Sequence, residues 1–232
     1  MRLVAALLFG AGPVGAQTAP SLGAAQSFAV VGGSAVTNTG PTIVTGDLGL
    51  SPGSAVTGFP PGVVAGIVHV SDAPAASAQS AITTAYNSLA GQSCTQDLTG
   101  QDLGGKNLTP GVYCFSSAAQ LTGALTLNAQ GAAGGVFIFK IGSSLTTASG
   151  SSVILAGNAS PCNVFWQVGS SATVGTSTSF VGNILALTSI TLNTSSNLTG
   201  RALARNGAVT LDTNSITAPC TTGVPARSCP TQ

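Results

Sequence analysis

Charged side chains are scarce in this 232-residue chain: they make up 5% of it, and glutamate is absent. Six Lys and Arg residues stand against five Asp residues and one histidine, so the formal net charge is +1. A groove for nucleic acid needs clustered basic residues, whereas the basic residues here are scattered along the sequence. We therefore expect no nucleic-acid partner.

The shortage of acids and histidine also argues against catalysis. Solenoid enzymes that cleave polysaccharides need paired carboxylates, a metal site or a base acting on a sugar acid. Asp47 and Asp212 fall in different repeats, and Asp97 and Asp102 lie in a glycine-rich stretch that we interpret as a loop. His69 has no serine or cysteine nucleophile pattern beside it. Asp readily bonds its own backbone in turns, so we interpret these residues as turn or surface residues. We therefore predict no enzyme, no catalytic residue, no metal site and no cofactor.

The first apolar run is too short to span a bilayer, which takes about 20 residues. It extends from Leu3 to Phe9, follows Arg2, and precedes the small residues that end at Ala16. This pattern is typical of a secretory signal peptide over residues 1–16. We therefore expect a secreted, extracellular protein with no membrane partner, one domain over residues 17–220, and a C-terminal tail over 221–232.

Five cysteines occur, and none forms a CxxC pair. In an exported chain this indicates disulfides rather than a metal site. Cys94 with Cys114 would close a local loop, and Cys162 with Cys220 could staple the last part of the fold, which leaves Cys229 odd. The sequence alone leaves this connectivity open.

Similar segments recur along a chain that is rich in small residues yet 44% hydrophobic. Thr173, Thr191 and Thr210 each open such a segment, at spacings of 18 and 19 residues. That period is too long for a hairpin repeat and fits one coil of a β-solenoid with three short strands. Weaker copies lie at residues 36–46, 125–129 and 145–155.

Two predicted strands, at residues 136–141 and 164–168, are apolar on both sides and should be buried on both faces. One stretch, at about residues 74–90, has apolar residues at helical spacing, with Pro74 at its start and Gly91 after its end. We predict a mainly β fold: a parallel β-solenoid with one long α-helix packed along one face.

A column of small hydroxyl residues precedes the apolar second strand of successive coils. Its candidate contact residues are Thr39, Thr42, Ser149, Ser151, Ser152, Thr176, Thr178, Ser179, Thr194, Ser196, Asn197, Thr213 and Ser215. Alternate strand residues lie about 6.6 Å apart and coils about 4.8 Å apart, so the column predicts a planar grid. A stiff threonine presents a methyl and a hydroxyl together, which can hold and anchor ordered water.

The same hydroxyl residues allow other interpretations. Threonine and serine suit exposed strands in any case. A structural or adhesive module whose hydroxyl face binds carbohydrate or a cell surface is the alternative, and a polysaccharide-cleaving enzyme is a third reading.

Several motifs occur in a fixed order along the chain: Val44 to Gly53, Leu108 to Tyr113, Val136 to Gly142, Asn163 to Gly169, Gly182 to Ala186 and Gly200 to Ala204. Together they resemble the secreted microbial ice-binding (antifreeze) proteins. The resemblance covers about Leu22 to Cys220. It implies a right-handed, roughly triangular solenoid that is discontinuous in chain order, with a flanking helix, and it implies ice as the partner of a protein that we expect to be a monomer.

The family resemblance also implies a Thr-Ala/Gly-any-Thr/Asn motif on the ice-adsorbing face. Thr39-Gly40-Pro41-Thr42 fits this motif fully. The segment from Thr194 to Asn197 has serine at the small position, and the segment from Thr213 to Ile216 departs further. These departures bear on the strength of adsorption and on which ice planes are bound.

Overall fold

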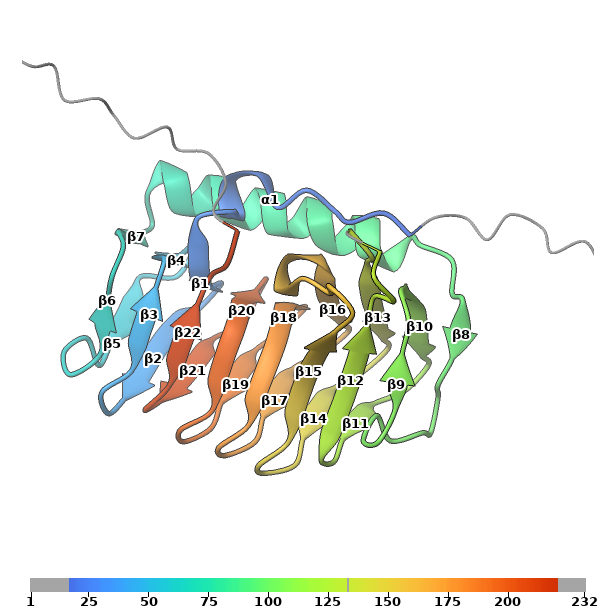
Figure 1. The fold of residues 1–232 in the computed structure, drawn as a ribbon. Coiled ribbons are helices and arrows are strands. Elements are labelled where there is room, and N and C mark those ends of the chain that lie inside the picture. Colours follow the sequence, from blue (N-terminus) through green and yellow to red (C-terminus); the bar gives the residue numbers. More distant parts are fainter. Residues whose placement is uncertain (1–16, 133, 221–232) are drawn as a thin grey trace, which may run out of the picture.

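The computed structural model describes residues 17–132 and 134–220. The predicted signal peptide, the C-terminal tail and Cys229 lie outside the described residues. Parallel strands stack into a solenoid with three faces, and one helix lies along its length (Figure 1).

The first face carries the helix, so we call it the helix face. Two of its strands are apolar on both sides, as predicted: β16 is buried at every residue, and β13 at all but Lys140. The strands of this face are β1 (Phe28–Gly32), β4 (Asp47–Leu50), β7 (Val68–Val70), β8 (Gln96–Asp97), β10 (Gly111–Phe115), β13 (Phe137–Ile141), β16 (Val164–Val168) and the second halves of β18 (Ser179–Ala186) and β20 (Asn197–Ala204).

The second face is a separate sheet, which we call the threonine face. In most of its strands two buried residues flank one that points outward, because successive side chains of a strand alternate between the two sides. Its strands are β2 (Ala35–Thr39), β5 (Ala55–Thr57), β11 (Ala119–Leu121), β14 (Leu145–Thr147), β17 (Ala172–Val174), β19 (Ile190–Leu192) and β21 (Val209–Asp212).

The third face completes each coil and is exposed on its outer side. It is formed by β3 (Ile43–Thr45), β6 (Val63–Val64), β9 (Asn107–Leu108), β12 (Ala124–Asn128), β15 (Ser152–Ala156), β22 (Ser215–Thr217) and the first halves of β18 and β20. Two short 3-10 helices, η1 (Gly23–Ala25) and η2 (Pro161–Asn163), lie outside the coils.

The chain does not run along the solenoid in order. Strands β1 to β7 build one end, helix α1 (Ala73–Ala90) returns along the solenoid, and the coils from β8 onward grow back from the other end. The late strands β21 and β22 therefore pair with the early strands β2 and β3, as Figure 1 shows by the contact of red and blue ribbons. This is the discontinuous solenoid that the family resemblance implies.

A buried arginine ties this junction together. The Arg201 guanidinium donates to the carbonyls of Gln26 (2.7 Å) and Pro219 (2.8 Å) and to the side-chain oxygen of Asn183 (2.9 Å). Burial lowers the pKa of Arg201 to about 10. Gln26 near the start of the described chain and Pro219 near its end are thus held by the same side chain.

Aromatic rings stack along the interior beneath the helix face. Phe139 lies flat on Trp166 with ring centroids 3.9 Å apart, and Tyr113 and Phe180 flank this pair. Tyr113, Phe139 and Trp166 stack because they occupy matching positions in successive coils. Flat, well-packed rings keep the coils parallel.

Helix α1 confirms the predicted cover of the solenoid. It spans Ala73–Ala90 against a predicted 74–90, and the Asp72 carboxylate caps it by accepting from the backbone N–H of Ala75 (2.9 Å). His69 is bonded to the same carboxylate (2.7 Å) and lies against Phe28, in keeping with a structural histidine.

The predicted disulfides are confirmed: Cys94 is bonded to Cys114, and Cys162 to Cys220. Two other predictions are wrong. Asp97 lies in β8, paired with Cys114, and not in a loop, because a two-residue strand is too short to show an alternating pattern. The repeat at residues 125–129 is β12 of the third face, so it is no copy of the segment at Thr173, which lies in β17 of the threonine face.

Candidate functional site

A ladder of threonines runs along the threonine face. One outward residue from each strand lies opposite the next in register, and the ladder consists of Thr57, Thr37, Thr210, Thr191, Thr173 and Thr146, followed by Gln120. Neighbouring parallel strands lie about 4.8 Å apart, so the hydroxyls form an evenly spaced row. The Oγ1 atoms of Thr37 and Thr210 are 3.3 Å apart and hydrogen bonded.

A second row beside this ladder contains only alanine and serine. It comprises Ala55, Ala35, Ala208, Ser189, Ser171 and Ser144, each two residues before a ladder threonine. The carbonyl of a row member accepts from the residue that follows the neighbouring member, as in the bond from the Ile190 N–H to the Ala208 carbonyl (2.9 Å). Because no side chain in this row is large, the surface beside the threonines is flat.

The turn between the threonine face and the third face explains the small second position of the predicted motif. At this position the backbone φ is positive in five coils: 75° at Gly40, 54° at Thr213, 61° at Ser195, 55° at Ser177 and 68° at Gly150. Glycine adopts this left-handed conformation freely, and larger side chains resist it. The motif is therefore first of all the signature of a turn.

The predicted column needs one correction in register. Leu192 pairs with Leu211 and Asn197 with Ser215, so the turn at residues 212–214 is one residue shorter than the turn at 193–196. The position equivalent to Thr194 is consequently Asp212, and Thr213 takes the left-handed position of Ser195.

Four predicted contact residues point inward, which contradicts an outward grid at these positions. Thr42, Thr178 and Ser196 are 0% exposed and Ser151 is 1% exposed. Their hydroxyls bond backbone groups of the turns: Thr178 donates to the Ala148 carbonyl (3.1 Å) and Ser196 to the Asn193 carbonyl (2.8 Å). Such buried hydroxyls satisfy the backbone where the chain leaves one sheet for the next.

The other predicted residues reach the surface in two rows. Thr39, Ser149, Thr176 and Thr194 are exposed at the turns and extend the threonine face. Ser179, Asn197 and Ser215 are exposed, and Ser152 partly so, in one register on the third face. Thr213 is partly exposed between the two rows.

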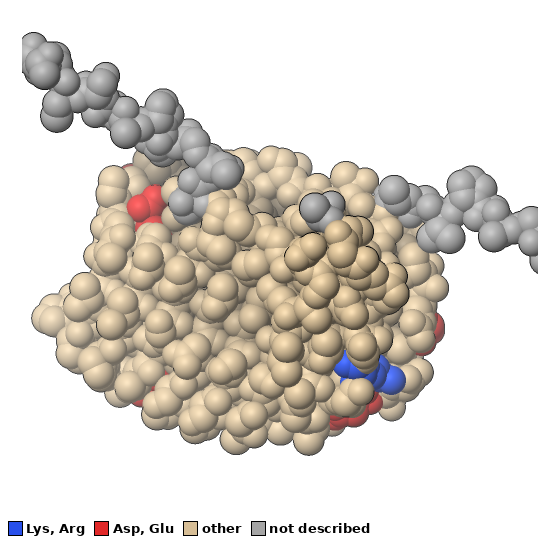
Figure 2. Space-filling view, in the orientation of Figure 1, with Lys and Arg blue, Asp and Glu red and all other residues tan. Residues whose placement is uncertain are grey.

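Charge is nearly absent from this surface. Asp212 is the one charged residue in the described strands of the threonine face, and Asp102 lies at its edge, bridged to Gln120. The Asp212 carboxylate accepts from the hydroxyls of Thr194 (2.5 Å) and Thr213 (3.0 Å). Figure 2, which looks onto the third face, likewise shows charges at the margins and an uncharged centre.

The ladder threonines themselves were not among the predicted contact residues. Thr173, Thr191 and Thr210 marked the repeat, but they were not assigned to a surface. The signal was present, since each is a threonine between two apolar residues, the pattern of a strand with one outward side chain.

Comparison with known proteins supports one interpretation of this geometry. Residues 30–217 match the model of the ice-binding-like family. The chain belongs to this family. An ice-binding protein of Nostoc sp. (strain HG1) is 55% identical over 202 residues, which are 87% of this chain and 75% of the relative.

Solved structures of this family share the fold. An ice-binding protein from an Antarctic biological consortium superposes with a TM-score of 0.85 at 48% identity, over 87% of this chain and 92% of the other. One from the Antarctic ascomycete Antarctomyces psychrotrophicus gives a TM-score of 0.85 at 40% identity, over 87% of this chain and 98% of the other. The relatives are named for ice binding and not for an enzyme activity.

Two structural features bear on other functions. Over residues 17–132 and 134–220, no group of three or more His, Cys, Asp or Glu side chains is placed to hold a metal ion. Within the same part of the chain, no helix is long and apolar enough to cross a membrane.

Proposed function

We propose that this protein adsorbs to ice through the threonine face and its adjoining turn, and so inhibits ice growth or recrystallisation. The observation that carries the proposal is the threonine ladder in register from Thr57 to Thr146. A regular row of stiff side chains, each with a methyl and a hydroxyl, can order a layer of water over a long distance.

The contact surface includes the exposed part of the predicted column. Thr39, Ser149, Thr176 and Thr194 widen the ladder by a row, and the exposed residues Ser179, Asn197 and Ser215 continue it around the turn. The buried hydroxyls of Thr42, Ser151, Thr178 and Ser196 hold the turns and make no contact with ice. Adsorption then depends on flatness and regularity, since Asp212 is the one charge in the described strands of this face and no single contact is strong.

The protein acts outside the cell, as a monomer and without cofactor or catalysis. Its disulfides support an oxidising compartment. The threonine face is built from the coils of one chain, so a second copy is not needed to complete it.

Thermal hysteresis and recrystallisation assays on residues 17–232 test this proposal directly. We expect shaped ice crystals and a measurable hysteresis gap. Thr194→Tyr should reduce the gap, because a bulky ring lifts the ice from the flat surface. Thr84→Tyr, on the exposed side of α1, is the matched control and should keep full activity. If the unaltered protein gives the circular dichroism spectrum of a folded protein but shows no hysteresis, the proposal is overturned.

A further inference from the structure

One row of outward-facing residues on the helix face changes from apolar to polar side chains near the end of the helix. In register it runs Val31, Leu203, Leu185, Gln167, Lys140, Cys114 and Asp97. The first three are apolar and pack with α1 in one hydrophobic cluster. The remaining members, apart from the disulfide-bonded Cys114, are polar.

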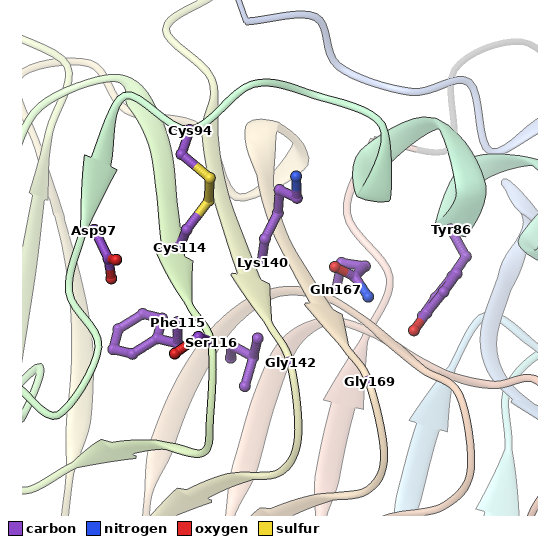
Figure 3. A pocket seen from close by; sticks show the side chains of 11 residues that line it. Tyr86, Cys94, Asp97, Cys114, Phe115, Ser116, Lys140, Gly142, Gln167 and Gly169 are labelled. Atoms are coloured by element: carbon purple, nitrogen blue, oxygen red, sulfur yellow. A yellow bond between two sulfur atoms is a disulfide. The ribbon is translucent and has the colours of Figure 1, made fainter.

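A cavity of about 480 Å³ lies over this polar part of the row. Tyr86 of α1, the Cys94–Cys114 disulfide, Ser116, Lys140, Gln167 and Asp97 line it (Figure 3). Gly142 and Gly169 lie at the turn beside it and add no side chain. Its volume falls in the range of small-molecule sites, roughly 300–1,000 Å³.

The Gln167 amide lines this cavity without a protein partner. Within residues 17–132 and 134–220 its side chain makes no hydrogen bond, and its amide atoms are open to the cavity. An amide that both donates and accepts therefore faces the cavity, ready to bond a polar ligand.

Two opposite charges follow this amide in the row: Lys140 is next to it, and Asp97 lies beyond Cys114. Lys140 is next to Gln167 on β13 and donates to the Gln92 carbonyl (2.5 Å), which leaves further N–H donors on its ammonium. Asp97 lies two strands from Lys140, or about 9.6 Å between backbones. No ion pair joins the two within the described residues. Hydrogen bonds from the side chain and backbone of Thr99 lower the pKa of Asp97 from 3.8, so its carboxylate is ionised at neutral pH.

We propose that this cavity binds a small zwitterion that carries one ammonium and one carboxylate group, such as a free α-amino acid. Lys140 and the adjacent Gln167 amide bond the ligand carboxylate, Asp97 accepts from the ligand ammonium, and the ligand lies over the Cys94–Cys114 disulfide between them. Charge-assisted bonds of about 2.8 Å at each end, with one carbon between the ligand groups, span the separation of the two strands. A simple anion, a simple cation or a neutral sugar leaves one of the two charges unmatched.

This site is independent of ice adsorption, because it lies on the helix face and not on the threonine face. The test is a titration of the ¹⁵N-labelled protein, residues 17–232, with glycine, followed by nuclear magnetic resonance. We expect shifts confined to the backbone near Asp97, Cys114, Lys140 and Gln167, and to the Gln167 side-chain amide, with a millimolar midpoint. Acetate, ethylammonium and glucose, titrated separately, should each bind about tenfold more weakly, as for one lost charged hydrogen bond.

Variants separate this site from a general salt effect. Asp97→Asn and Lys140→Gln should each weaken glycine binding about tenfold, with thermal hysteresis unchanged. Lys106→Gln is the matched control, because Lys106 bonds Gln101 outside the cavity. If Lys140→Gln disturbs the loop held by Gln92, Asp97→Asn alone decides. Absence of shifts in the cavity, or equal midpoints for glycine and glucose, overturns the proposal.

Discussion

The threonine face and the third face are two exposed sheets of the same solenoid, yet their surfaces differ. The threonine face repeats one side chain in register from Thr57 to Thr146. The third face has a shorter row of three threonines in register, Thr199, Thr217 and Thr45. Its other rows are mixed: one contains Val63, Ile43 and Ser215, and another contains Ile154 and Thr126. The backbone spacing is common to both sheets, so regular strands alone do not make a regular surface. The proposed function depends on the side chains that the repeat selects.

The strongest test of this difference places the same bulky substitution on both faces of one coil. Thr191 and Thr199 lie eight residues apart, on β19 and β20. We expect Thr191→Tyr to remove most of the thermal hysteresis, because the ring interrupts the ladder at its centre. Thr199→Tyr should retain most of it, and Tyr is tolerated in strands at both positions.

Hysteresis of both variants, measured at equal concentration, makes this comparison. A larger loss for Thr199→Tyr would move the contact surface to the third face. Thermal unfolding of each variant controls for stability.

A second prediction separates the buried polar residues of the turns from the exposed turn residues. Asn214 is 3% exposed, and its amide donates to the carbonyls of Asn193 and Ser196 (3.0 Å each). Asn214→Ala removes the amide donor of the buried Ser196 carbonyl, whereas the Asn193 carbonyl keeps its bond from the Ser196 hydroxyl. The loss should cost about 1–3 kcal/mol of unfolding free energy. Thr176→Ala, on the exposed row, should change stability by less than about 0.5 kcal/mol. Urea unfolding measures both, and equal losses would contradict the division into two rows.

The sequence predicted the solenoid well because its signals are local and repeated. Buried residues alternate around Thr173, Thr191 and Thr210, and Pro74 and Gly91 bracket the helix. The order of the coils is not a local signal, and it came from the family resemblance.

The candidate site was predicted less well, for two physical reasons. Serine and threonine are polar, but their hydroxyls can bond the backbone, so Thr178 and Ser196 are buried without penalty. In addition, the turn after Leu211 is one residue short, which shifts Thr213 out of the column of Thr194. A three-residue spacing in the sequence cannot reveal a shortened turn.

The third prediction concerns the one charge that interrupts the threonine face. Asp212 occupies the position of Thr39 and Thr194 in the exposed turn row, and its carboxylate binds the hydroxyl of Thr194. Asp212→Thr should raise hysteresis modestly, because it removes a hydrated charge and extends the row of threonines. Asp212→Lys keeps a charge at this position and should lower activity. A fall in hysteresis for Asp212→Thr, with stability unchanged, would show that the carboxylate serves to position Thr194.

The smallest effect that we predict is the pH dependence of stability, which should come from the titratable end of the helix face and not from the nearly charge-free threonine face. The pKa of Asp72 is lowered from 3.8 by the hydrogen bond from the Ala75 backbone and then by its bond to His69. A carboxyl with a lowered folded pKa stabilises the fold above its unfolded pKa, and this contribution is lost as the pH falls through the folded value. Thermal unfolding from pH 6 to pH 2 should therefore show a small loss of stability below about pH 4. Asp72→Asn should reduce that loss, because asparagine still caps the helix but does not titrate.

Hysteresis of the folded protein should stay constant between pH 5 and pH 8. A marked change in that range would mean that a titrating group takes part in adsorption.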